Sequence, residues 1–302
     1  MAEWIDLLDP SPEELRAHLP ENVHPRALEQ LLAPAEHDDE PRPKIEGHGN
    51  YIFAVFLVPR AVPKEDRIYF QEIDQIGTRT TLLTIRKTPE GGEPYDISEA
   101  KQACRPDEGV GMYAYHLVDD IAERYLDFID VLNDEIDEVE DNVERWDPEK
   151  TRGRVSDLRH DLLHIRRTLG PMRDAIHGVV DNRVELEDGL PLMDREVELN
   201  FAAVYDKFLR AYDGLELSRD LVAGVRDYLQ SKVSNDQNEV MKKLTVIASV
   251  LLLPTFIVGL YGQNFRHHFP EIGWQWGYAW SWGLIIVTTI AQLAFFRSKR
   301  WI

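Results

Sequence analysis

Two apolar stretches near the C-terminus decide the fold: residues 244–261, LTVIASVLLLPTFIVGLY, and residues 277–296, GYAWSWGLIIVTTIAQLAFF. Neither stretch contains an Asp, Glu, Lys, Arg or His residue. A helix needs about 20 apolar residues to cross the roughly 30 Å hydrocarbon core of a bilayer. Because the segment between them is short, the two stretches predict a hairpin of transmembrane helices.

The positive charges around these spans predict their orientation. Only Arg266 lies in the segment between them, whereas Lys and Arg residues gather on their other sides. These residues are Lys232, Lys242 and Lys243 before the first span, and Arg297, Lys299 and Arg300 after the second. Positive charge favours the cytoplasmic side. We therefore expect a multi-pass protein of the cell membrane with both termini in the cytoplasm.

The composition limits the remaining possibilities. Most of the 302 residues precede the first span, which is enough chain for one or two soluble domains. The net charge of −20 argues against nucleic acid as a partner, since phosphates require a basic surface. Residues 1–12 lack the basic and apolar regions of a signal peptide, and the single cysteine, Cys104, excludes an intramolecular disulfide framework.

The segment before the spans shows two kinds of pattern. Residues 51–58, 68–73 and 80–85 are short apolar runs rich in β-branched and aromatic residues, so they predict strands. From Leu117 onward, apolar residues recur every three or four positions, with a break at Asp147-Pro148. This pattern predicts an α/β domain followed by an antiparallel hairpin of two long helices.

A single long helix is expected to lead into the first span. After Pro191 no proline occurs until Pro254, so helix is predicted from about residue 192 to Tyr261, roughly 105 Å at about 1.5 Å per residue. Small and polar residues recur along its last part at steps of three, four or seven, namely Asn238, Met241, Ala248, Leu252, Thr255, Gly259 and Gly262. Such a stripe is typical either of a pore lining in a ring of copies or of ordinary helix packing in a membrane, and periodicity alone leaves both open.

The end of this helix resembles the CorA magnesium transporter family, whose motif is Gly-Met-Asn. The matching segment is residues 254–265, which contain Tyr261-Gly262-Gln263-Asn264-Phe265. The opening at residues 4–10 and the basic tail at residues 299–302 are also similar to the family, so the resemblance spans nearly the whole chain. The chain departs from the motif at Gln263, which stands where the family has methionine.

The resemblance implies a funnel-shaped homopentamer in the lipid bilayer. It implies a selectivity filter at Gly262, Gln263 and Asn264, a regulatory metal at Asp227, and an outer loop containing Glu271. The implied pore-lining residues are Asn238, Met241, Leu244, Ala248, Leu252, Thr255 and Gly259. The implied segments are a cytoplasmic α/β domain (1–116), a helical hairpin (117–190), a stalk helix (191–243), transmembrane helix 1 (244–262), an outer loop (263–276), transmembrane helix 2 (277–297) and a basic tail (298–302).

The same resemblance implies the transported ion. Mg2+ is expected as both cargo and regulator, taken up under the membrane potential, with Co2+, Ni2+ or Zn2+ as further cargo. Gln263 and the histidine pair His267 and His268 keep a second interpretation open, a transporter of zinc or another transition metal of the ZntB type, with or without coupling to protons. Adjacent loop histidines are more often simply exposed to solvent.

Two other classes of protein were weighed against transport. An enzyme is not expected, because no P-loop or G-x-S-x-G motif occurs and the pair His160 and His164 lacks the glutamate of a zinc protease. A membrane-anchored scaffold, binding partners through its acidic hairpin, stays possible from sequence. Ion flux through purified protein separates a transporter from a scaffold.

Overall fold

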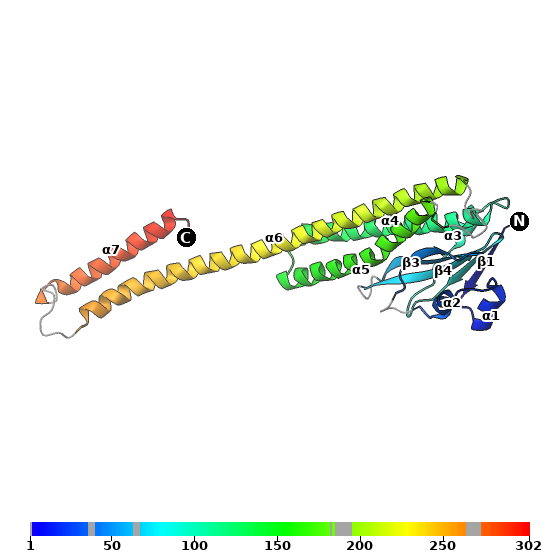
Figure 1. Ribbon diagram of the computed structural model, residues 1–302. Coiled ribbons are helices and arrows are strands. Elements are labelled where there is room, and N and C mark those ends of the chain that lie inside the picture. The colour runs from blue at the N-terminus through cyan, green and yellow to red at the C-terminus, as the bar shows by residue number, and fades with distance from the viewer. Residues whose placement is uncertain (1, 36–39, 63–66, 182, 185–194, 264–272) are drawn as a thin grey trace. The chain divides into compact units, whose positions relative to one another are not determined.

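The computed structural model describes residues 2–35, 40–62, 67–181, 183–184, 195–263 and 273–302 (Figure 1). The chain divides into two compact units, Met1–Arg226 and Asp227–Ile302, which we describe separately. The helix α6 (Arg195–Tyr261), 67 residues long, contributes to both of them. The first unit contains the sheet and the helical hairpin, and the second contains the apolar helices.

The first unit is built on a five-stranded mixed sheet. Its strands are β1 (Glu3–Leu8), β2 (Lys44–Gly47), β3 (Ile52–Val62), β4 (Arg67–Gly77) and β5 (Thr81–Arg86), in the order β1-β5-β4-β3-β2. β1 is parallel to β5, and the other neighbours are antiparallel. The three predicted strands correspond to β3, β4 and β5, whereas the two edge strands were not predicted.

Helices cover both faces of this sheet (Figure 1). The short helices α1 (Pro12–His18) and α2 (Pro25–Leu32) share one core with Phe53 and Val55 of β3. Phe56 on the opposite face of β3 lines a small cavity with Val118 of the helix α4 (Val110–Asn142). Burial on both faces explains why β3 is apolar at nearly every position rather than at alternate ones.

The predicted helical hairpin consists of α4 and α5 (Pro148–Val180). The Asp147 side chain accepts a hydrogen bond from the Lys150 backbone amide at 3.3 Å, and Pro148 occupies the first turn of α5, so the break predicted there is a helix start. α4 begins at Val110, earlier than the predicted Leu117, because its first turns are buried through Val110 and Ala114. α5 continues through Pro171 as one helix.

The first part of α6 packs against α4. Lys207 of α6 lies 2.6 Å from the Asp119 carboxylate of α4, and the Phe208 ring contacts the Tyr125 ring edge to face at 5.8 Å. Tyr125 is fully buried, and its hydroxyl donates to the Leu57 carbonyl of β3 at 2.7 Å. This tyrosine therefore joins the sheet, the hairpin and α6 in one core.

Candidate ion pathway in the membrane unit

The second unit consists of the last part of α6 and the helix α7 (Gly277–Ser298). Both helices are long and apolar enough to cross a membrane, and little of either is buried within the chain. Aromatic side chains that favour the membrane surface are exposed near the start of α7, namely Trp274, Trp276, Tyr278 and Trp280. By length, composition and exposure, the two helices are candidate membrane spans.

One side of α6 is used for contact with α7. The Gln292 side-chain amide of α7 donates a hydrogen bond to the Ser249 carbonyl of α6 at 3.1 Å. Val246 and Ile257 of α6 and Phe296 of α7 are buried in the same unit. At roughly 100° per residue, Val246, Ser249 and Ile257 share one side of the helix. α7 therefore covers this side only.

From Met241 onward, the stripe of small and polar residues lies on the other side of α6. Ala248, Thr255 and Gly259 are displaced from Val246 and Ile257 by roughly half a turn of the helix. All members of the stripe are exposed on the single chain: Asn238, Met241, Ala248, Leu252, Thr255, Gly259 and Gly262. Leu244, a further predicted pore-lining residue, is exposed as well. Packing of α6 on α7 therefore does not explain the stripe, which is free to face other molecules.

The stripe combines apolar and polar surfaces. Leu252 is 71% exposed and Met241 is 59% exposed, so the stripe presents large apolar side chains on the surface of the chain. The Thr255 hydroxyl donates to the Leu251 carbonyl at 2.7 Å. Because this bond uses the hydroxyl proton, the oxygen lone pairs stay available to accept hydrogen bonds from water.

Gly262 ends the helix at the predicted filter. Its amide donates to the Val258 carbonyl at 2.9 Å, and a Cβ atom at this position would lie 3.1 Å from that oxygen. Glycine is thus the residue that fits without displacing the backbone. Gln263 follows and is exposed. The remaining sequence predictions for this region, Asn264, His267, His268 and Glu271, lie outside the described residues.

The predicted regulatory residue Asp227 is exposed on α6. It precedes Asn238 by three turns, and the two differ by only roughly 20° around the helix. Asp227 therefore lies on nearly the same side of α6 as the inner end of the stripe. No metal partner for it was predicted from the sequence.

The first unit contains a cluster of three buried ionisable side chains. The Lys87 ammonium lies 2.6 Å from a Glu72 oxygen and 2.9 Å from an Asp74 oxygen, all three side chains being almost fully buried. Burial raises the pKa of Asp74 to about 8. The Glu72 carboxylate contributes to this rise, and the Lys87 ammonium opposes it. One ammonium cannot neutralise two carboxylates, so Asp74 retains its proton near neutral pH.

The histidine pair noted in the sequence does not act as a unit. His164 contacts Glu40 at 3.0 Å and packs edge to face on Phe70 at 4.9 Å between ring centres. His160 is exposed on the same helix. Among the described residues, these two histidines are not part of a common metal-ligand group.

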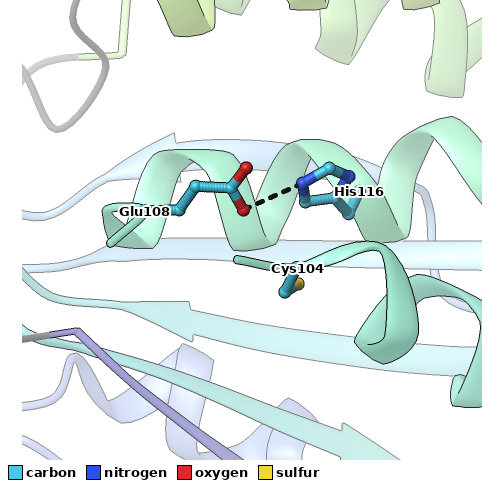
Figure 2. Close-up of side chains that lie close together, drawn as sticks. All are labelled: Cys104, Glu108 and His116. Carbon is cyan, nitrogen blue, oxygen red and sulfur yellow. Dashed lines mark hydrogen bonds and ion pairs between the residues drawn. The ribbon is translucent and has the colours of Figure 1, made fainter. Parts of the chain in front are cut away.

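A different group of ligand residues was missed by the sequence analysis. Cys104, Glu108 and His116 come together where the chain enters α4 (Figure 2). Their sequence spacing crosses a loop and the start of a helix, so it matches no helical or strand period. The only available signal was the proximity of three ligand residue types within a short stretch.

The fold and the two spans define a membrane protein with a large sheet-containing unit and two spanning helices per chain. Residues 2–300 match the family described as "CorA-like Mg2+ transporter protein". The chain belongs to this family. The members of this family are transporters rather than enzymes. Both the expected family and the expectation that the chain is not an enzyme are therefore confirmed.

Individual relatives agree with this assignment. The chain is 29% identical over 286 residues to the cobalt/magnesium transport protein CorA of Thermotoga maritima, covering 93% of this chain and 77% of that protein. Its fold is similar to the complete CorA structure of Methanocaldococcus jannaschii, with a TM-score of 0.76 and 22% identity, over 99% and 91% of the two chains. The ZntB cytoplasmic domain of Vibrio parahaemolyticus shares the fold at a TM-score of 0.55 and 17% identity, over 77% and 88% of the two chains.

Proposed function

We propose that this chain forms a homopentameric channel that takes up Mg2+ and is closed by cytoplasmic Mg2+. Co2+ and Ni2+ are further proposed cargo. The observation that carries the proposal is the exposed stripe on α6, which faces away from α7 in a chain of a metal-transporter family. Two spans cannot enclose a pore, so several copies are needed, with their stripes around a common axis.

The proposed filter consists of neutral oxygens. Mg2+ loses its water reluctantly and prefers octahedral oxygen coordination. A ring of Asn264 amides, with the Gly262 backbone carbonyls beneath it, accepts hydrogen bonds from the hydrated ion. A carboxylate ring would hold the cation more tightly, and conduction requires sites weak enough for the ion to leave.

The membrane potential supplies the driving force. Moving one charge across 100 mV is worth about 2.3 kcal/mol, so a divalent ion gains roughly 4.6 kcal/mol. Both termini are proposed to be cytoplasmic, on the basis of the Lys and Arg distribution. In this orientation Asp227 lies on the cytoplasmic side of the stripe.

The filter is tested by metal uptake into liposomes containing the purified full chain. Asn264→Ala is expected to reduce Mg2+ uptake at least roughly tenfold, because the outer ring of amides is lost. Asn235→Ala, which removes an exposed amide of α6 outside the stripe, serves as the control. Equal uptake by Asn264→Ala and the parent protein would rule out the proposed filter, and no uptake by the parent protein would favour a scaffold.

The sensor is tested by loading the liposomes with Mg2+. We propose that Mg2+ bridges Asp227 to an acidic group of a neighbouring copy and closes the pore. Asp227→Ala is then expected to weaken inhibition by internal Mg2+, whereas Asp236→Ala, an exposed acid on the opposite side of α6, keeps it. Unchanged inhibition in Asp227→Ala would exclude this residue from the sensor.

Gln263 favours a second candidate, transport of Zn2+ coupled to protons. Its side chain replaces the methionine of the family motif and is exposed at the end of α6, where it could add an oxygen ligand. Uptake of Mg2+, Co2+, Ni2+ and Zn2+ is therefore compared with and without a proton gradient. Zn2+ uptake that depends on the gradient and exceeds Mg2+ uptake would select the second candidate.

A further inference from the structure

Three different metal-ligating side chains meet at the start of α4 (Figure 2). Cys104 follows the short helix α3 (Ser98–Ala103), Glu108 lies in the connection, and His116 lies in the second turn of α4. The His116 Nε2 atom is 3.0 Å from the Glu108 Oε2 atom. One ligand atom from each of the three residues lies within 4.8 Å of the other two.

This spacing is close to that of a bound metal. With zinc–ligand bonds of about 2.0–2.3 Å, ligand atoms in a tetrahedral site lie roughly 3–4 Å apart. The three atoms therefore need to approach by only about 1 Å to share an ion. Glu108 is already oriented, because its Oε2 atom accepts a hydrogen bond from the Arg105 amide at 2.9 Å.

The cluster is sheltered but accessible. The side chains of His116 and Glu108 are 15% and 13% exposed, and Cys104 is half-buried. The Cys104 thiol donates a hydrogen bond to the Ala100 carbonyl at 3.3 Å, and an ion bound to the sulfur replaces this proton.

We infer that Cys104, Glu108 and His116 form a binding site for a borderline divalent cation, Zn2+ or Co2+. One sulfur, one nitrogen and one oxygen ligand with water as the fourth make a donor set typical of these ions. Mg2+ prefers oxygen ligands and is selected against by the thiolate and the imidazole. The site lies in the first unit, outside the stripe, and does not depend on ion flux.

The position of the site gives it a structural connection to α6. In the same turns of α4, the Met112 sulfur accepts a hydrogen bond from the Asn200 amide of α6 at 3.5 Å. Tyr115, next to His116, contacts the Phe201 ring of α6 edge to face. A bound ion would link the segment before α4 to the turns of α4 that contact α6.

The chain offers a specific spectroscopic test. The purified full chain in detergent is titrated with Co2+, and thiolate-to-cobalt charge-transfer absorption is recorded in the near ultraviolet. Because Cys104 is the single cysteine of the sequence, this band reports Cys104 alone and not ions in the pore. We expect the band to saturate at one Co2+ per chain, to disappear on addition of Zn2+, and to persist in excess Mg2+.

Variants distinguish a three-ligand site from adventitious binding to the thiol. His116→Gln and Glu108→Gln are each expected to weaken Co2+ binding at least roughly tenfold, because loss of even an outer-shell partner of a ligand typically costs about 10–100-fold in metal affinity. His160→Gln, an exposed histidine of α5, serves as the control. Absence of the band in the parent protein, or an unchanged Co2+ midpoint in both variants, would overturn the inference.

A second measurement does not depend on cobalt. The rate at which Cys104 reacts with an aromatic disulfide reagent is expected to fall at least tenfold when Zn2+ is bound in the parent protein. In a variant that retains the parent elution volume and far-ultraviolet spectrum, Zn2+ should no longer slow the reaction. Equal protection by Zn2+ in His116→Gln would contradict the site. These results stand whether or not the chain transports Mg2+.

Discussion

The two units of the chain differ in whether their large apolar side chains are buried or exposed. The first unit buries its large aromatic and aliphatic side chains within the chain, including Phe53, Phe56 and Tyr125. In the second unit, most large apolar side chains are exposed, among them Leu251, Leu252, Phe256, Val258, Val287 and Ile290. The first unit therefore completes its core by itself, whereas the second leaves its apolar surface exposed to lipid or to other molecules.

A similar difference exists between the two sides of α6 within the second unit. One side contacts α7 through Ser249 and buries Val246 and Ile257. The other side carries the exposed stripe with Ala248 and Thr255. Substitutions on the two sides, and in the two units, should consequently have different effects.

The largest effect is expected from filling the stripe. Ala248→Phe places a large ring on the stripe and should reduce Mg2+ uptake by the full chain in liposomes at least roughly tenfold, because it obstructs a narrow pore. Ile247→Phe introduces the same ring one residue earlier, roughly 100° around the helix, and is expected to retain uptake within about twofold. If both variants lose uptake equally, the stripe is not distinct in function from the neighbouring exposed surface of α6.

The next effect concerns pH and is confined to the first unit. With a folded pKa of about 8 and an unfolded value near 4, Asp74 holds a proton in the fold that the unfolded chain releases across this window. Stability should therefore fall as pH rises from about 4 to 8 and become constant above it. Asp74→Asn removes this dependence and should melt higher than the parent chain at pH 8, by at least about 5 °C.

Thermal melting of the full chain in detergent at pH 5 and pH 8 measures this difference. Asp127→Asn, which changes an exposed acid of α4, is the matched control and should follow the parent chain at both values. Parallel changes in melting temperature for the parent chain and Asp74→Asn would show that the buried carboxyl is ionised throughout. The contact of Lys87 with both Glu72 and Asp74 would then hold two ionised carboxylates, contrary to the raised pKa of Asp74.

A smaller effect is expected at the buried hydroxyl of Tyr125. Tyr125→Phe removes the hydrogen bond to the Leu57 carbonyl and should lower the free energy of unfolding by about 1 kcal/mol. Tyr278→Phe removes a hydroxyl from an exposed ring of the second unit and should leave the unfolding of the first unit unchanged. Denaturant unfolding followed by far-ultraviolet circular dichroism compares the two variants, and equal losses would contradict the separation into two units.

The smallest effect is expected at the contact between the membrane helices. Gln292→Leu removes the donor to the Ser249 carbonyl, and side-chain hydrogen bonds within membranes contribute on average well under about 1 kcal/mol. The apparent melting temperature in detergent should thus change by only about 1–2 °C. A fall several times larger would show that this bond, rather than apolar packing, holds α7 on α6.

The amino-acid sequence alone determined the membrane spans, the long helices and the family motif. Spans are readable because the bilayer selects apolar residues at each position along a continuous stretch, independently of distant parts of the chain. β3, β4 and β5 were predictable for a related reason, since each carries its own run of buried residues. The start of α4 was misplaced because its first turns are fixed by packing rather than by caps or period.

Tertiary structure alone decided the remaining features. β1 pairs with β5 through Glu3 and Thr81, far apart in sequence, and its own residues show only one buried position. Periodicity could not choose between packing and exposure for the stripe, because that choice depends on which side of α6 is occupied by α7. The approach of Cys104, Glu108 and His116 likewise depends on the path of the chain between α3 and α4, which no short-range pattern specifies.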